Sequence, residues 1–163
     1  VAGNVPHPNL VQVLAYEPQR RAIVVELCDF NLEWLRVKVA LDVSEQVSLM
    51  RQIAVGCVWI VHQRAIHGNL TMQNILIAKT PDAQIAEGKA RYVAKVADCG
   101  LALRGSSTGA DADPKAGHRA PETQSGAHSE KSDVYSFGHI LHRTFCSHIG
   151  YLHTEVGGQA GEQ

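Results

Sequence analysis

A long apolar stripe in the middle of the chain limits its fold more than any other feature of the sequence. Between residues 44 and 62, apolar side chains recur every three to four positions: Val47, Met50, Ile53 or Ala54, Cys57 or Val58, and Val61. This spacing predicts an amphipathic helix of about five turns with one face against a core. We expect Ser44 to cap its N-terminus. Gly56 is a weak position inside it, costing about 1 kcal/mol relative to alanine.

Strand-like segments precede this helix. Leu10–Leu14 alternates apolar and polar residues, and Ala22–Leu27 is rich in β-branched residues. The polar turn Pro18–Arg21 between them predicts that the two strands pair as a hairpin. Asn31 is placed to cap a short helix over residues 32–39.

Shorter elements follow the long helix. Residues 74–77 and 92–97 predict two brief strands, and the polar stretch 79–91 between them predicts a solvated loop. Residues 104–118 offer almost nothing to bury, so we expect a mobile loop there. A last helix is predicted to begin near Ser132 and to run through Phe145. Strands and helices together predict an α+β domain.

Composition excludes several classes of protein. The 163 residues carry 15 Lys and Arg against 16 Asp and Glu, so the net charge of −1 gives no basis for general nucleic-acid binding. No apolar stretch reaches membrane-spanning length. The 4 cysteines form no CxxC pair, which argues against a zinc ribbon and fits reduced thiols in an intracellular compartment. The first residue is Val rather than Met, which suggests a fragment of a longer protein.

Short motifs stand in a definite order along the chain. They are His7-Pro-Asn9, His67–Asn74 (HGNLTMQN), Asp98–Gly100 (DCG), Ala120–Glu122 (APE) and Ser132–Gly138 (SDVYSFG). In this order the chain resembles the protein kinase family, whose catalytic loop, D-F-G and A-P-E segments match the middle three. The resemblance covers roughly residues 7–146. It looks most like the tyrosine-kinase-like and receptor-like branches.

The resemblance implies a protein-kinase-like fold that is only partly present. Residues 1–40 would hold the last strands of the small β lobe, the hinge and a short helix, and residues 41–148 most of the helical large lobe. Residues 149–163 would form a disordered tail. The family's Gly-rich loop and strand lysine would lie before residue 1, and its last helices after the end, so we expect a chain truncated at both ends.

The resemblance also implies a site for ATP and Mg²⁺. Asp98 and Asn74 match the two metal-holding positions. The adenine would meet the gatekeeper Val25, backbone groups of Glu26 and Cys28 in the hinge, and Leu76 beneath the ring. The alternative is that Asp98 and Asn74 only satisfy loop backbone groups as Asx turns.

Several positions depart from the family pattern. Asn69 stands where the family has the aspartate that accepts the substrate's proton, and an amide cannot take that proton. Thr71 replaces a lysine that lies near the transferred phosphate. Gly68 replaces the arginine that receives a phosphorylated loop, and Cys99 replaces the phenylalanine of D-F-G. Together these changes indicate relaxed catalytic demand.

Two further sets of residues have structural alternatives. His67 and Asp133 match the family's supporting network, in which the aspartate binds the catalytic-loop backbone; otherwise Asp133 is an exposed acid at a helix N-terminus. His139, His142 and Cys146 share one helix face and could hold zinc, although histidines tolerated on a helix explain them as well.

The function we predict is that of a pseudokinase, which binds nucleotide and protein partners in signalling. One alternative is an active ATP-dependent protein kinase whose missing parts lie upstream, and another is a gene fragment without function. We expect a cytoplasmic setting, with no nucleic acid and no membrane segment within the chain.

Overall fold

The computed structural model describes residues 6–98 and 119–146. Along the described chain, the strands and helices are β1 (Val13–Glu17), β2 (Ala22–Val25), β3 (Phe30–Asn31), α1 (Leu32–Lys38), α2 (Val43–His62), β4 (Ile75–Lys79), α3 (Asp82–Ala86), β5 (Tyr92–Val96) and α4 (Glu130–Phe145), with a 3-10 turn at Pro121–Ser125 before α4. The α+β class predicted from the sequence is confirmed. The predicted mobile loop, 104–118, and the predicted tail, 149–163, lie outside the described residues.

Helix α2 is the long helix that the apolar stripe predicts, but its cap is Asp42 rather than Ser44. The Asp42 carboxylate accepts the Glu45 N–H at 2.8 Å, and the Glu45 carboxylate accepts the Asp42 N–H at 3.1 Å. This reciprocal capping box satisfies two backbone donors, whereas a cap at Ser44 would satisfy one. The buried face of α2 packs against β5 and carries Leu49, Met50, Ile53 and Ile60.

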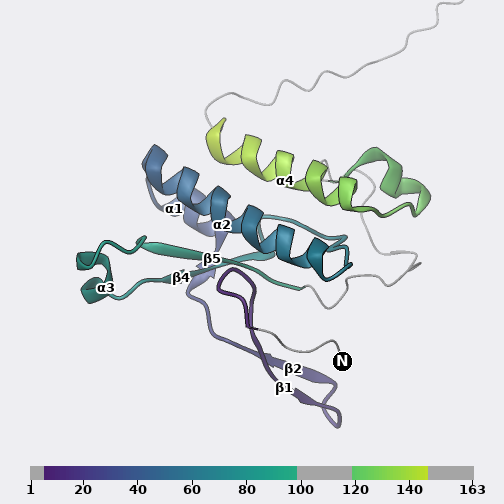
Figure 1. Cartoon of the computed structure of the whole chain (residues 1–163), viewed down its shortest axis with the longest axis horizontal. Helices are drawn as coiled ribbons and strands as arrows, with labels where there is room; N and C mark the ends of the chain where they lie inside the picture. Colours follow the sequence, from purple (N-terminus) through teal and green to yellow (C-terminus); the bar gives the residue numbers. More distant parts are fainter. Residues whose placement is uncertain (1–5, 99–118, 147–163) are drawn as a thin grey trace, which may run out of the picture.

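Strands β3, β4 and β5 form an antiparallel sheet in that order, and α2 lies across one of its faces (Figure 1). Alternate residues of β4 and β5 are fully buried beneath α2, among them Ile75, Ile77, Ala94 and Val96. The other residues of these strands, Leu76 and Lys95 among them, face the opposite side.

The predicted hairpin is confirmed, with different bounds for its strands. β1 pairs antiparallel with β2, and the two-stranded sheet extends away from the rest of the described chain (Figure 1). Leu10 and Val11 do not belong to β1, because they pair with Val96 at the edge of β5. Apolar side chains on the hairpin stay exposed, including Leu14, Tyr16 and Ile23.

Two predictions, one for the β4–β5 connection and one for Gly56 inside α2, differ from the structure. The connection between β4 and β5 is not all loop, since β4 continues to Lys79 and the short helix α3 follows. Gly56 is not a weak position, because a Cβ atom there would lie 2.6 Å from the Asn9 carbonyl oxygen. Glycine is required where the segment around Asn9 crosses α2.

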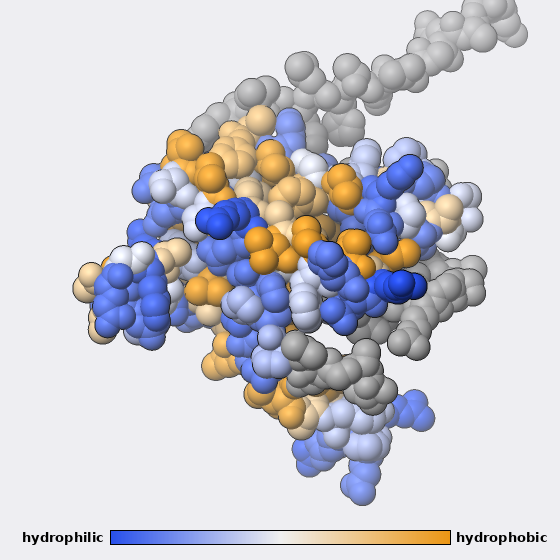
Figure 2. All heavy atoms as spheres, viewed as in Figure 1, coloured by the Kyte–Doolittle hydropathy of each residue, from blue (hydrophilic) through white to orange (hydrophobic). Residues whose placement is uncertain are grey.

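The two remaining helices agree with the sequence in outline. Asn31 caps α1 by accepting the Trp34 N–H at 2.9 Å, as predicted. α4 begins at Glu130 rather than near Ser132, because the Ser132 hydroxyl reaches back to accept the Ser129 N–H at 3.1 Å. α4 lies beside α2, and Figure 2 shows hydrophobic side chains gathered over the face that these two helices form.

Candidate functional site

Residues 67–74 form a loop between α2 and β4 that α4 holds from the side. The buried Asp133 carboxylate accepts the His67 N–H at 2.7 Å and the Gly68 N–H at 2.9 Å. Gly68 has φ +73°, a conformation that favours glycine. Asp133 is thus not an exposed helix-terminal acid, and it makes the backbone contact that the resemblance implies.

The His67 ring joins this loop to the end of β5. Its Nε2 lies 2.8 Å from the Ala97 carbonyl oxygen, and its Nδ1 accepts the Asn69 N–H at 3.3 Å. These two contacts require the tautomer with the proton on Nε2. The fully buried ring therefore places the start of the loop directly beside the residue that precedes Asp98.

Asn74 closes the far end of the loop. Its side-chain NH₂ donates to the Asn69 carbonyl oxygen at 2.9 Å, and its N–H donates to the Thr71 hydroxyl at 3.2 Å. The Asn74 carbonyl oxygen accepts the Ala97 N–H at 2.8 Å. Asn69 and Thr71 are therefore brought together with Asn74, and the Thr71 hydroxyl is used to close the turn.

Asp98 follows β5 and is exposed, with φ +63°. The preceding residue, Ala97, donates its N–H to the Asn74 carbonyl oxygen, so Asp98 directly follows a residue that contacts Asn74. The Asn74 side-chain oxygen and the Asp98 carboxylate accept no hydrogen bond from the residues described. Such oxygen atoms, which accept no other hydrogen bond, are the hard ligands that Mg²⁺ prefers. The rest of the D-F-G-like segment, Cys99 and Gly100, lies outside the described residues.

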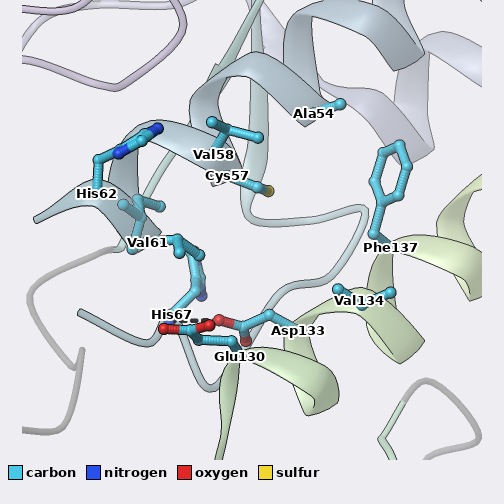
Figure 3. A pocket seen from close by; sticks show the side chains of 11 residues that line it. Ala54, Cys57, Val58, Val61, His62, His67, Glu130, Asp133, Val134 and Phe137 are labelled. Atoms are coloured by element: carbon cyan, nitrogen blue, oxygen red, sulfur yellow. Dashed lines mark hydrogen bonds between the residues drawn. The ribbon is translucent and has the colours of Figure 1, made fainter. Parts of the chain in front are cut away.

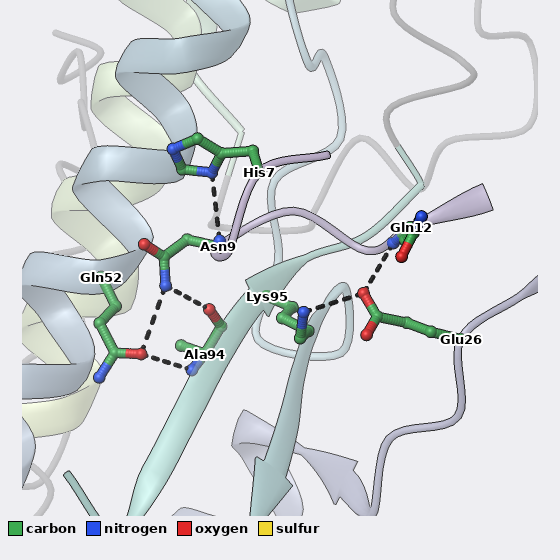
Figure 4. Close-up of polar contacts among 7 residues, drawn as sticks. All are labelled: His7, Asn9, Gln12, Glu26, Gln52, Ala94 and Lys95. Carbon is green, nitrogen blue, oxygen red and sulfur yellow. Dashed lines mark hydrogen bonds and ion pairs between the residues drawn. The ribbon is translucent and has the colours of Figure 1, made fainter. Parts of the chain in front are cut away.

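The predicted hinge residues lie between β2 and β3, above the open face of the sheet. Val25 ends β2 and is exposed, whereas Glu26 and Cys28 are half-buried. Leu76 lies opposite Lys95 in the register of β4 and β5. Because the Lys95 ammonium pairs with the Glu26 carboxylate at 2.9 Å, the hinge is joined to the strand face that carries Leu76. Figure 4 shows this ion pair beside the Gln12 N–H, which also donates to Glu26.

The charges of Glu26, Lys95 and Asp29 act on the thiol of Cys28. Burial raises the pKa of Cys28, the carboxylates of Glu26 and Asp29 raise it further, and the nearby Lys95 ammonium opposes them. Cys28 is therefore held as a neutral thiol rather than as a reactive thiolate.

Sequence reasoning missed Lys95 and the contacts of Asn9 and Gln52. The Asn9 side chain donates to the Ala94 carbonyl oxygen at 3.0 Å, and Gln52 on α2 accepts the Ala94 N–H at 2.8 Å (Figure 4). The motif around Asn9 signalled that this segment matters, but no sequence pattern pairs it with residues more than 40 positions away.

An apolar cavity of about 220 Å³ lies behind the loop, between α2 and α4. Figure 3 shows Cys57 and Val58 from α2 across from Val134 and Phe137 from α4, with His67 and Asp133 at one end. The cavity thus adjoins the supporting network of the loop, through His67 and Asp133.

Other predicted features can be tested in part. Among residues 6–98 and 119–146, no group of three or more His, Cys, Asp or Glu side chains could hold a metal ion, so the structure gives no zinc site at His139, His142 and Cys146. The helices within these ranges include none long and apolar enough to span a membrane.

Comparison with known proteins gives one consistent family. Residues 1–152 match the family model described as protein tyrosine and serine/threonine kinase. The dual specificity protein kinase zakA of Dictyostelium discoideum is 29% identical over 160 residues, covering 89% of this chain and 20% of that protein. The serine/threonine-protein kinase BIK1 of Arabidopsis thaliana is 30% identical over 163 residues, covering 85% of this chain and 36% of that protein.

A third relative matches a shorter part of the chain. A probable inactive receptor kinase of Arabidopsis thaliana is 41% identical over 76 residues, covering 46% of this chain and 10% of that protein. The chain spans between 18% and 36% of the length of the first four curated relatives that it matches.

Proposed function

Because this chain belongs to the protein tyrosine and serine/threonine kinase family, we propose that it acts as a pseudokinase, a kinase-like domain that binds nucleotide and protein partners without efficient phosphotransfer. The family in general uses ATP and Mg²⁺. In this proposal, residues 1–40 belong to the small lobe and hinge, residues 41–148 belong to the large lobe, and the setting is cytoplasmic signalling.

The identity of residue 69 carries the proposal. Asn69 lies in a loop whose backbone is held by His67 and Asn74, at the position where the family places its catalytic carboxylate. An amide cannot accept the proton of a substrate hydroxyl, and loss of a general base costs roughly 10²–10⁴ in rate. Thr71 adds to the loss, since it supplies no cation beside the transferred phosphate.

Nucleotide binding is the activity that the remaining residues support. Asp98 and Asn74 offer two oxygen donors that would hold Mg²⁺, which neutralises phosphate charge when it is bound. The backbone of Glu26 and Cys28 would hold the adenine edge, with Leu76 beneath the ring and Val25 at the rear. The ion pair of Glu26 with Lys95 holds this segment against the sheet. Because the Glu26 N–H already donates to the Gln12 carbonyl oxygen at 3.0 Å, the Glu26 carbonyl oxygen is the group of that residue that would meet the adenine.

The second candidate is an active protein kinase, and the joint presence of Asn74 and Asp98 favours it. Relatives are named both as kinases and as an inactive receptor kinase. Since phosphoryl transfer depends largely on positioning and electrostatics, a domain that retains both metal-holding positions could keep some activity. Binding and transfer must therefore be measured separately.

The experiment measures the thermal stability of the chain with and without Mg²⁺ and ATP, and phosphotransfer to a mixed peptide substrate. A ligand at 100 times its Kd stabilises by about 2.7 kcal/mol, so we expect a clear rise in Tm. Asp98→Asn should abolish the Mg²⁺-dependent part of that rise, whereas Glu87→Gln, an exposed change of the same kind, should leave it intact. Brisk phosphotransfer that stops in Asn69→Ala would establish the active kinase instead. No Tm shift at millimolar ATP would refute nucleotide binding.

A further inference from the structure

The Glu33 carboxylate joins three parts of the chain that lie far apart in the sequence. Its Oε1 accepts a hydrogen bond from the Arg143 guanidinium at 3.2 Å, and its Oε2 accepts one from the side-chain amide of Gln73. Glu33 lies in the first turn of α1 and Arg143 in the last turn of α4, whereas Gln73 belongs to the loop and directly precedes Asn74. One carboxylate therefore links the loop to two helices.

The place of Glu33 in its helix does not by itself account for these contacts. An acidic residue in the first turn is favoured by the helix dipole whichever way its side chain points. Here each carboxylate oxygen has its own donor, which fixes the orientation of the side chain as well as its charge. The side chains of Glu33 and Arg143 are 32% and 26% exposed, so the ion pair is partly withdrawn from water. The other ion pairs between described residues lie outside the loop and do not contact it.

The small sheet brings α1 to this end of the loop. β3 ends at Asn31, which lies opposite Leu76 in β4, and α1 begins at the next residue. Gln73 lies just before β4 begins. The first turn of α1 and the last residues of the loop therefore meet beside the same strand.

Gln73 is held at the end of the loop that carries a predicted metal ligand. Among the described residues, two hydrogen bonds join this end to other elements: the Ala97 N–H donates to the Asn74 carbonyl oxygen at 2.8 Å, and the Gln73 amide donates to Glu33. The bond from the Asn74 side chain to Asn69 lies within the loop, so it moves with the loop. Because Mg²⁺ demands nearly ideal ligand geometry, the direction of the Asn74 side-chain oxygen depends on how firmly this end is held.

We propose that Glu33 is a positioning residue for Mg²⁺ at Asn74, and that Arg143 keeps the Glu33 carboxylate turned toward Gln73. The inference rests on the nucleotide binding proposed above. Since Glu33 contacts the loop and not the hinge, its effect falls on the part of nucleotide affinity that depends on Mg²⁺.

Calorimetric titration with ATP, in EDTA and in saturating Mg²⁺, tests this, and the ratio of the two Kd values is the Mg²⁺ effect. Glu33→Ala removes both contacts and should reduce the Mg²⁺ effect about fivefold or more, with the Kd in EDTA changed less than about twofold. The control Glu17→Ala breaks the ion pair with Arg20 in the hairpin, and both Kd values should stay within about twofold of the wild type. The double variant Glu33→Arg with Arg143→Glu keeps an ion pair and lets the amide oxygen of Gln73 act as acceptor, so it should recover most of the Mg²⁺ effect.

Hydrogen exchange of the Asn74 amide gives a readout that needs no nucleotide. This N–H donates to the Thr71 hydroxyl, and it should exchange faster in Glu33→Ala than in the wild type, Glu17→Ala or the double variant. An unchanged Mg²⁺ effect in Glu33→Ala, an equal loss in Glu17→Ala, unchanged exchange at Asn74, or a double variant no better than Glu33→Ala would each overturn the inference. If the wild type binds no ATP, the proposed function fails, and the exchange rates alone decide whether Glu33 holds the loop.

Discussion

Replacing Gly56 with alanine tests how closely residues 7–11 are held against α2 and β5. The added Cβ atom would lie 2.6 Å from the Asn9 carbonyl oxygen and 3.0 Å from a methyl group of Val96. A backbone oxygen cannot rotate away as the end of a flexible side chain can. Either the segment around Asn9 or the helix must therefore move.

The hydrogen bonds that this segment could lose determine how far the free energy of unfolding falls in Gly56→Ala. Asn9 accepts the Val96 N–H at 2.9 Å, Val11 donates to the Val96 carbonyl at 2.9 Å, and the Asn9 amide donates to Ala94 at 3.0 Å. At about 0.5–1.5 kcal/mol net for each bond, losing all of them costs roughly 1.5–4.5 kcal/mol. Alanine returns about 1 kcal/mol through its helix propensity. We expect the free energy of unfolding to fall by roughly 0.5–3.5 kcal/mol.

Urea unfolding monitored by circular dichroism measures this change, and Gly138→Ala is its control. Gly138 lies inside α4, where an added Cβ meets nothing within 4 Å, so alanine there should raise the free energy of unfolding by about 0.5–1 kcal/mol. Hydrogen exchange of the Val11 and Val96 amides should accelerate in Gly56→Ala alone. If both variants stabilise the chain equally, the close approach at Asn9 is refuted.

Three other changes give measurable outcomes. Asp133→Ala leaves two loop N–H groups without their acceptor and should lower the free energy of unfolding by about 2–4 kcal/mol in urea. Alkylation of Cys28 by iodoacetamide, followed by mass spectrometry, should require a higher pH than a free cysteine, because its raised pKa lowers the thiolate fraction; Glu26→Gln should move the profile back to lower pH. Asn69→Asp alone should not restore phosphotransfer in a radiolabel assay, because position 71 still lacks a cation.

Each of these has a result that would contradict its reasoning. Loss of less than about 0.5 kcal/mol in Asp133→Ala, the size expected for the exposed Glu87→Ala, would mean that the two N–H groups find other partners. If the pH profile for alkylation of Cys28 matches that of glutathione, or does not change in Glu26→Gln, then burial and the nearby charges do not raise the pKa of this thiol. Robust phosphotransfer in Asn69→Asp would show that Thr71 matters less than we propose.

Local signals in the sequence were sufficient for α1, α2, α4 and the hairpin, but not for the short helix α3, which lies in a stretch predicted to be loop. The apolar stripe predicts α2 and the Asn31 cap predicts α1, since both depend on residues within one or two turns. The errors were at boundaries. Ser44 and Asp42 are both good capping residues, and only the reciprocal bond with Glu45 decides between them.

Contacts between distant segments could not be predicted in the same way. Gly56 reads as a helix defect until Asn9 is placed against it, and Lys95 reads as a solvated strand residue until Glu26 is placed beside it. The motif order predicted that Asp133 would meet the loop near His67, because a family resemblance carries spatial information that periodicity lacks. It gave no such information for the stacking of Phe30 on Trp34, which joins β3 to α1.

The hydrogen bonds of the loop explain how its shape can persist with an amide rather than a carboxylate at residue 69. Asn69 contributes its N–H to His67 and its carbonyl oxygen to Asn74, and both are backbone groups that any residue except proline supplies. The side chains that hold the loop are those of His67, Asn74 and Asp133. Folding therefore constrains these three positions and leaves the side chain of residue 69 unconstrained. In the pseudokinase that we propose, an aspartate at 69 would be needed for proton transfer alone, so replacing Asn69 by Asp should change the chemistry and not the stability.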